Sequence, residues 1–202
     1  RNTIQKDTLK GIDMSHFNGQ IDWALIKSQN ISYAYAKATQ GTGFIDTRFE
    51  DKWNSMKETG ILRGAYHFYD PKQPPKNQAE YFIKVVGKLE KDDFPPMLDL
   101  EGSSIGGLSV SVYQNDVIEW LQIVEKHYGV SPIIYTDNPF GNEFLKNQIF
   151  SKYKLWVAEY TDAPRPEVPL TWRENGWYIW QHSASSDLKG ISGYVDSDIL
   201  VR

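Results

Sequence analysis

The sequence contains no cysteine, so disulfide bonds, thiolate catalysis and thiolate metal sites are excluded. It also lacks any run of about 18 uncharged apolar residues, and we expect no membrane insertion. There is no excess of positive charge: 22 basic residues stand against 26 acidic ones, and the net charge of −4 gives no electrostatic case for binding nucleic acid. The four histidines form no close ligand pair, so we expect neither a metal nor another cofactor.

Aromatic side chains, by contrast, are abundant and make up 14% of the 202 residues. A chain of this length can bury a substantial core, which accounts for most of them. Aromatic rings near polar groups can also stack on the flat faces of sugars. We predict a single domain over residues 1–202, in which residues 1–9 form an N-terminal extension. The chain begins with Arg1, and we expect a preceding segment to have been removed.

Short runs typical of β-strands alternate with helical patterns along most of the chain. The predicted strands cover residues 10–15, 31–39, 61–70, 94–102, 131–137, 154–160, 176–183 and 194–201. The predicted helices cover residues 21–30, 46–60, 77–90, 110–128 and 139–150. A capping-box pattern of Thr47 and Glu50 marks the start of the second helix, and Gly60 marks its end.

This alternation predicts parallel strands with helices packed outside them. Eight strands favour a closed barrel, although no helical pattern separates the last two. We therefore predict an α/β fold: an irregular (β/α) barrel of about eight strands and five helices, poor in helix in its C-terminal third. The alternative is an open doubly wound sheet, but no glycine-rich phosphate fingerprint follows the first strand.

The segment "MLDLEG" carries two acids, Asp99 and Glu101, at the end of an apolar run. Because strand side chains alternate between faces, both acids point the same way, about 6.6 Å apart along the backbone. Two acids this close in a site of low dielectric constant do not readily ionise together, so the pKa of one should be raised. A protonated acid beside an ionised one is what cleavage of a glycosidic bond requires.

Other polar and aromatic residues fall at the predicted strand ends, where barrel enzymes carry their functional groups. In a closed barrel the first and last strands are neighbours, so we expect Asp13 to lie near Asp196. The remaining candidates are Lys37, Tyr66, His67, Tyr135, Asp137, Trp156, Glu159, Gln181, His182 and Asp198. An acid at a strand end is often only a helix cap or a loop anchor, and we assign Asp22, Asp46 and Asp116 to that class.

Eight segments occur in the order seen in glycoside hydrolase family 25, the Chalaropsis-type lysozymes, and the sequence resembles that family over residues 10–200. The segments are GIDMSHFNGQIDW, YAKATQGTGFIDTRFE, GAYHFY, MLDLEG, IIYTD, LWVAEY, WYIWQHS and GYVDSDI. The resemblance implies an irregular β/α barrel that hydrolyses the β-1,4 bond between N-acetylmuramic acid and N-acetylglucosamine in peptidoglycan.

By motif, the resemblance implies that Glu101 is the general acid. Asp99 is then its partner, either as a base or as the residue that orients the substrate's acetamido group. Asp13 matches the acid of the first-strand D-x-S motif, and Asp196 matches the acid near the C-terminal end. The predicted substrate-binding residues are Lys37, Tyr66, Phe68, Tyr135, Trp156, Glu159 and Gln181. One departure from the family pattern is Asp198, a position where asparagine is common.

We predict a secreted or phage-released muramidase that acts on peptidoglycan strands as a monomer, outside the cell or in the cell wall. A carbohydrate-binding barrel that has lost catalysis is the alternative from another class, and the four intact acids argue against it. A chitinase with a D-x-x-D-x-D-x-E motif is an enzyme alternative, but the residues before Asp99 are "PPML". Two mechanisms stay open: inversion through an activated water, and retention assisted by the substrate.

Overall fold

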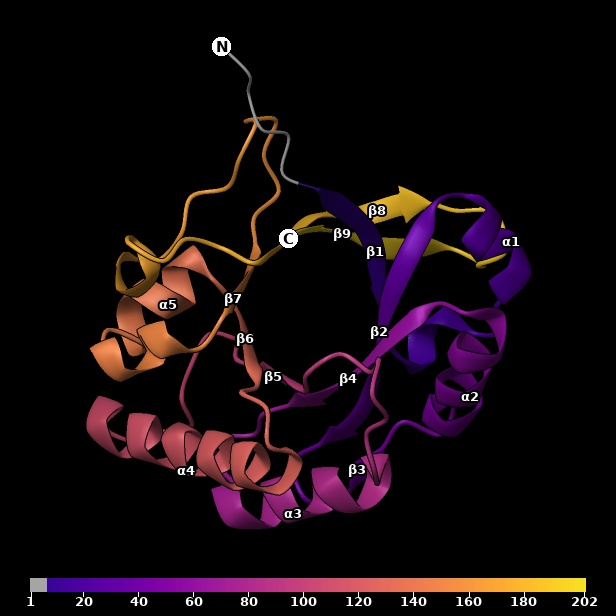
Figure 1. Cartoon of the computed structure of the whole chain (residues 1–202). Helices are drawn as coiled ribbons and strands as arrows, with labels where there is room; N and C mark the ends of the chain where they lie inside the picture. Colours follow the sequence, from indigo (N-terminus) through magenta and orange to yellow (C-terminus); the bar gives the residue numbers. More distant parts are fainter. Residues whose placement is uncertain (1–6) are drawn as a thin grey trace.

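The computed structural model describes residues 7–202, and eight of its strands close a barrel (Figure 1). A ninth strand, β3 (Phe44–Ile45), pairs with β2 outside the ring and was not predicted. The ring contains, in order, β1 (Thr8–Met14), β2 (Ile31–Gln40), β4 (Leu62–Phe68), β5 (Met97–Asp99), β6 (Ile133–Asp137), β7 (Leu155–Ala158), β8 (Ile179–Asp187) and β9 (Tyr194–Val201). The predicted closed barrel is confirmed, and the open doubly wound sheet is wrong.

Strand β9 breaks the parallel pattern, because it runs antiparallel to both of its neighbours, β1 and β8. The other neighbouring pairs in the ring are parallel. No helix lies between β8 and β9, so the chain turns back on itself instead of crossing over the outside of the barrel. The first residues of β9 therefore lie at the end of the barrel where the other strands finish.

Five α-helices lie outside the barrel, away from the outer face of β8 and β9 (Figure 1). They are α1 (Trp23–Ser28), α2 (Phe49–Thr59), α3 (Pro75–Val86), α4 (Val110–Tyr128) and α5 (Asn138–Phe144), with 3-10 turns at His16–Asn18, Gln148–Lys152 and Leu170–Trp172. The last third of the chain has no α-helix after α5, as predicted. None of the helices in residues 7–202 combines the length and apolar character needed to cross a bilayer.

Several element boundaries differ from the sequence prediction. Helix α2 begins at Phe49 with Arg48 at its N-cap and no side-chain cap, so the predicted capping box is wrong. Asp46 instead accepts a hydrogen bond from the backbone N–H of Arg48, at 3.0 Å. Helix α3 ends at Val86, and the following Gly87 has a φ of 70°, a positive value that glycine adopts without strain. Strand β1 already includes Thr8, so the end of the predicted extension belongs to the barrel.

Two of the acids assigned to caps or loops behave as expected and one does not. Asp22 caps α1 by accepting a hydrogen bond from the backbone N–H of Leu25, at 3.0 Å. Asp46 anchors the turn before α2, as described above. Asp116 lies inside α4 and caps nothing, so that assignment is wrong.

Large aromatic side chains of β2 fill the barrel interior. A Cβ atom added to Gly11 would lie 2.2 Å from the ring of Tyr33, and one added to Gly64 would lie 2.3 Å from the ring of Tyr35. The missing side chains on β1 and β4 therefore make room for the two rings. Trp156 closes the packing, with its ring edge-on to Tyr35 at 4.8 Å between centroids.

His67 faces outward, into the core between the barrel and the helices. It is fully buried, and its ring stacks on Trp120. Its two nitrogens lie 2.7 Å from Thr39 Oγ1 and 2.9 Å from Gln78 Oε1. Burial lowers the pKa of His67 to about 4, so the ring is neutral near pH 7. His67 is a structural residue and not part of a site at the strand ends.

Candidate active site

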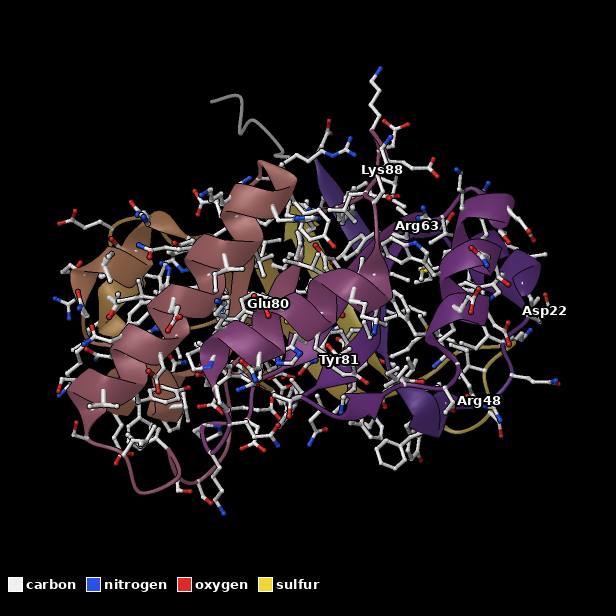
Figure 2. All side chains as sticks on the ribbon, turned by 90° about the horizontal axis from the view of Figure 1, so that it is seen from below. Asp22, Arg48, Arg63, Glu80, Tyr81 and Lys88 are labelled. Carbon is white, nitrogen blue, oxygen red and sulfur yellow. The ribbon has the colours of Figure 1, made fainter. Side chains whose placement is uncertain are left out.

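The carboxyl groups of interest gather at the end of the barrel where the parallel strands finish, which we call the mouth. Figure 2 shows the barrel from the side, with Arg48, which precedes α2, toward the mouth and Arg63, near the start of β4, toward the opposite end. Because β9 is antiparallel, its early residue Asp196 reaches the mouth and pairs in register with Asp13. The predicted closeness of Asp13 and Asp196 is confirmed.

Asp99 and Glu101 form a linked pair at the mouth. Asp99 is the last residue of β5 and is 7% exposed, whereas Glu101 follows the strand and is accessible to solvent. Leu100, between them, is buried in the outer core, so the two acids share one side as predicted. Their carboxyl groups lie close enough for each to change the pKa of the other, so the two acids titrate as a pair that can share one proton.

The pKa values of both acids are raised. Burial is the main cause for Asp99, and the charge of Glu101 raises the pKa of Asp99 further. Burial also raises the pKa of Glu101; the hydrogen-bonding interaction with Asp99 lowers it, and the charges of Asp137 and Asp196 raise it, with a net increase. The pair therefore keeps a proton at a pH where an isolated carboxyl group has lost it. In addition, Asp99 Oδ1 is buried and accepts no hydrogen bond from an N–H or hydroxyl group of the described residues.

Asp13 and Asp196 form a second carboxyl cluster with Asp198. Burial raises the pKa of Asp13, and the charge of Asp198 raises it further. Burial and the charge of Asp13 raise the pKa of Asp196 to about 8. The charge of Asp13 also acts on Asp99, so the two clusters influence each other.

Gln181 connects this second cluster to two tyrosines. Its Nε2 donates a hydrogen bond to Asp13 Oδ2 at 2.8 Å. Its Oε1 accepts hydrogen bonds from the hydroxyl groups of Tyr135 at 2.8 Å and Tyr160 at 2.7 Å. These three bonds fix which way the amide points. The sequence analysis missed Tyr160, although counting in twos along the strand from the inward-facing Trp156 leads to it.

Lys37 places a positive charge beside the Asp99–Glu101 pair. Its Nζ donates to Gln40 Oε1 at 2.6 Å and lies over the rings of Phe44 and Phe68, 5.1 and 5.0 Å from their centroids. Burial lowers the pKa of Lys37, and the charge of Asp99 opposes that effect. A cation held between two rings and next to carboxyl groups is well placed for binding a polar ligand.

Two predicted substrate-binding residues make hydrogen bonds within the protein near the mouth. Trp156 is fully buried below it and donates from Nε1 to Asp198 Oδ1 at 2.9 Å, so its ring has no free face for a sugar. The carboxylate of Glu159 accepts a hydrogen bond from the backbone N–H of Glu167 at 2.6 Å and so ties down the following loop. Burial raises the pKa of Tyr66, and the charges of Asp13 and Asp99 raise it further, so Tyr66 lies near both clusters.

The mouth can supply a proton and a negative charge side by side. Across residues 7–202, no group of three or more His, Asp or Glu side chains has the arrangement of a metal site. A closed barrel whose strand ends carry a proton-sharing carboxyl pair, framed by tyrosines, defines the class of glycoside hydrolases.

Comparison with known proteins identifies the family. The profile described as "Glycosyl hydrolases family 25" matches residues 12–191, and the chain belongs to this family. It is 34% identical to the uncharacterized protein YegX of Escherichia coli K12, over 96% of this chain and 70% of YegX. It is 33% identical to lysozyme M1 of Streptomyces globisporus, over 93% of this chain and 66% of that protein. The crystal structure of a lysozyme from Streptomyces coelicolor superposes with a TM-score of 0.88 at 32% identity, covering 94% of this chain and 90% of that one.

Proposed function

We propose that this chain is a muramidase that hydrolyses the β-1,4 bond between N-acetylmuramic acid and N-acetylglucosamine in bacterial peptidoglycan. It acts as a monomer on glycan strands, outside the cell or in the cell wall. Family membership and the lysozyme names of the relatives support the substrate class. The observation that carries the chemistry is the proton-sharing pair of Asp99 and Glu101.

In the proposed reaction, Glu101 donates its proton to the glycosidic oxygen as the bond from that oxygen to the anomeric carbon breaks. The acetamido oxygen of the same sugar forms the new bond to the anomeric carbon, while Asp99 accepts a hydrogen bond from the acetamido N–H. Water then attacks the anomeric carbon as the bond from that carbon to the acetamido oxygen breaks, which restores the acetamido group, and Glu101 takes up the proton of that water. The unpaired Asp99 Oδ1 supports the assignment of Asp99 as the orienting residue.

The spacing of the pair favours this route over inversion. Inversion requires about 6.5–9.5 Å between the two carboxyl groups, to leave room for the attacking water. The direct interaction of the Asp99 and Glu101 carboxyl groups supports a shorter separation than this. A covalent bond from Asp99 to the sugar is the remaining alternative, and the stereochemistry of the first product does not separate it from acetamido participation, because both retain configuration.

The test uses purified peptidoglycan and measures new reducing ends, whose identity and anomeric form are read by mass spectrometry and NMR. The wild type should release reducing-end muramic acid with retained configuration, and Glu101→Gln should lower the rate at least about 1,000-fold. Glu80→Gln is the matched control, because Glu80 lies on the outer side of α3 and is exposed (Figure 2). Release of reducing-end N-acetylglucosamine, or undiminished activity of Glu101→Gln, would contradict the proposal.

A further inference from the structure

A groove runs along the outside of the barrel between α1 and α2, which lie side by side (Figure 1). It has a volume of about 570 Å³ and is lined by the loop 19–21, by Trp23 and by one face of the segment 48–58. Beside its lower end, Lys27 Nζ on α1 donates a hydrogen bond to the backbone O of Thr59 at 2.8 Å. This bond holds α1 against the end of α2, so the groove is a preformed part of the fold.

The groove begins next to the mouth. Lys52, which lines it, donates a hydrogen bond from Nζ to the backbone O of Ser15, and Ser15 is two residues beyond Asp13. Arg48 lies toward the mouth (Figure 2), and Glu58 follows ten residues later, about 15 Å away along the helix axis. A group attached to a substrate in the mouth can therefore enter the groove and follow it along α2.

Four charged side chains line the groove, and none of them forms an ion pair with another described residue. Arg48 and Lys52 are cations, and Asp51 and Glu58 are anions. Lys52 is only 4% exposed, and its bond to Ser15 leaves two of its three N–H donors without an acceptor among residues 7–202. Because burying an ammonium group is costly unless hydrogen bonds compensate for the lost water, Lys52 points to an anionic group bound in the groove.

We propose that this groove binds the short peptide that peptidoglycan carries on the lactyl group of its muramic acid. The proposal rests on the muramidase function proposed above, because the sugar cleaved in the mouth bears that peptide. The peptide has a free carboxylate on its glutamate residue and, where the next residue is a diamino acid, a free amino group as well. A chain of about four residues spans about 13–14 Å when extended, which matches the distance from Arg48 to Glu58.

The lining of the groove complements this peptide in charge and polarity. Arg48 and Lys52, near the mouth, are placed for the glutamate carboxylate, and Glu58 is placed for the amino group further along the chain. Trp23 offers an apolar wall to the methyl groups of the alanine residues, and Ser55 offers a hydroxyl group to the peptide bonds. Binding energy from the peptide would thus favour glycan strands that still carry it over bare ones.

The kinetic experiment compares two substrates: soluble glycan chains with their peptides, and the same chains after an amidase has removed the peptides. The KM of wild type should be lower for the peptide-bearing chains. Arg48→Gln and Glu58→Gln, both at exposed positions, should each raise this KM about 3- to 10-fold, with kcat and the KM for bare chains unchanged. Lys88→Gln is the matched control, because it removes one charge at an exposed position toward the opposite end from the mouth (Figure 2). Its KM values should follow wild type for both substrates.

A binding experiment needs no cleavage. The free peptide, L-alanyl-γ-D-glutamyl-L-lysyl-D-alanine, is added to wild type and to Arg48→Gln, and NMR records the backbone amide shifts. At about 10 mM peptide, wild type should show shifts at residues 19–21 and 52–55, and Arg48→Gln should show smaller ones.

Two results would overturn the proposal: an equal ratio of the two KM values in Arg48→Gln and wild type, or the absence of peptide-induced shifts in the groove. Glu101→Gln reports separately on the proposed function, through cleavage of bare glycan chains. The failure of one proposal is therefore distinguishable from the failure of the other.

Discussion

The side-chain amide of Gln181 donates a hydrogen bond of 2.8 Å to Asp13, from the strand on the far side of β9. The same amide accepts hydrogen bonds from Tyr135 and Tyr160 through its oxygen. Gln181 is 2% exposed, so water does not replace these partners easily. One buried amide thus sets the orientation of an acid and of two phenols at the mouth.

Replacing Gln181 with methionine should lower kcat/KM about 10- to 100-fold. Methionine keeps the volume but leaves Asp13 and both phenols without their partner, and a buried group that loses its hydrogen bond costs about 1–3 kcal/mol. Tyr160→Phe removes only one of the three bonds and should cost less than Gln181→Met. Steady-state kinetics on soluble glycan fragments checks this order, and equal effects of the two variants would contradict it.

The alkaline fall in activity should depend on Asp99. Glu101 must be protonated to act as an acid, and activity therefore falls as the pH rises through the upper pKa of the pair. Because the pKa values of both acids are raised, this fall lies above the ordinary carboxyl range of about 4. In Asp99→Asn no second carboxylate opposes the loss of the last proton of the pair, so the fall in residual activity should move below the upper pKa of the wild-type pair. A pH profile of kcat/KM from 4 to 9 measures this shift, and an unmoved profile would count against coupling of the pair.

Much of the barrel could be predicted because its strands and helices follow their sequence periods. The pairing of Asp13 with Asp196 followed from closure alone, since closure makes the first and last strands neighbours. The direction of β9 could not be predicted from the same pattern. A strand reads alike in either direction, and only the connection to β8 shows that the chain turns back.

The face that a residue occupies could be predicted where the strand period was counted and was missed where it was not. Asp99 and Glu101 share a side because they are two apart, as predicted. Trp156 and Glu159 are three apart and therefore cannot share one, and Tyr160 takes the place that had been given to Glu159. The depth of Trp156 had no signal in the sequence, because depth depends on how the strands are staggered around the barrel.

The glycine at position 64 should be essential for packing. A Cβ atom there would lie 2.3 Å from the ring of Tyr35, which is fully buried and held by a hydrogen bond from its hydroxyl group to Pro95 O at 2.8 Å. Gly64→Ala should therefore lower the free energy of unfolding by about 1–3 kcal/mol. Chemical denaturation measures the loss.

Gly43→Ala provides the control, because a Cβ atom added at Gly43 meets nothing within 4 Å. Its free energy of unfolding should stay within about 0.5 kcal/mol of wild type. In the double variant Gly64→Ala with Tyr35→Leu, the smaller side chain makes room for the new methyl group. The loss of unfolding free energy in the double variant should then be smaller than the sum of the losses in the two single variants. Strict additivity would show that the added methyl group does not collide with the ring of Tyr35.

His67 should make the protein less stable in mild acid. Its pKa is about 4 in the folded protein and about 6.5 when unfolded, so only the unfolded chain binds the proton between these values. The stabilisation is fully present above pH 6.5 and is lost as the pH falls toward 4, by up to about 3 kcal/mol. Thermal unfolding of His67→Gln should show a smaller drop in stability between pH 6.5 and 4.5 than wild type, even though the variant is less stable at pH 7 because the bonds to Thr39 and Gln78 are disturbed. His127→Gln, at an exposed position on α4, should follow the wild-type slope. If the stability of His67→Gln changed with pH as that of wild type does, the folded protein would have to bind a proton at His67 in this pH range. That result would contradict the full burial of the His67 ring against Trp120.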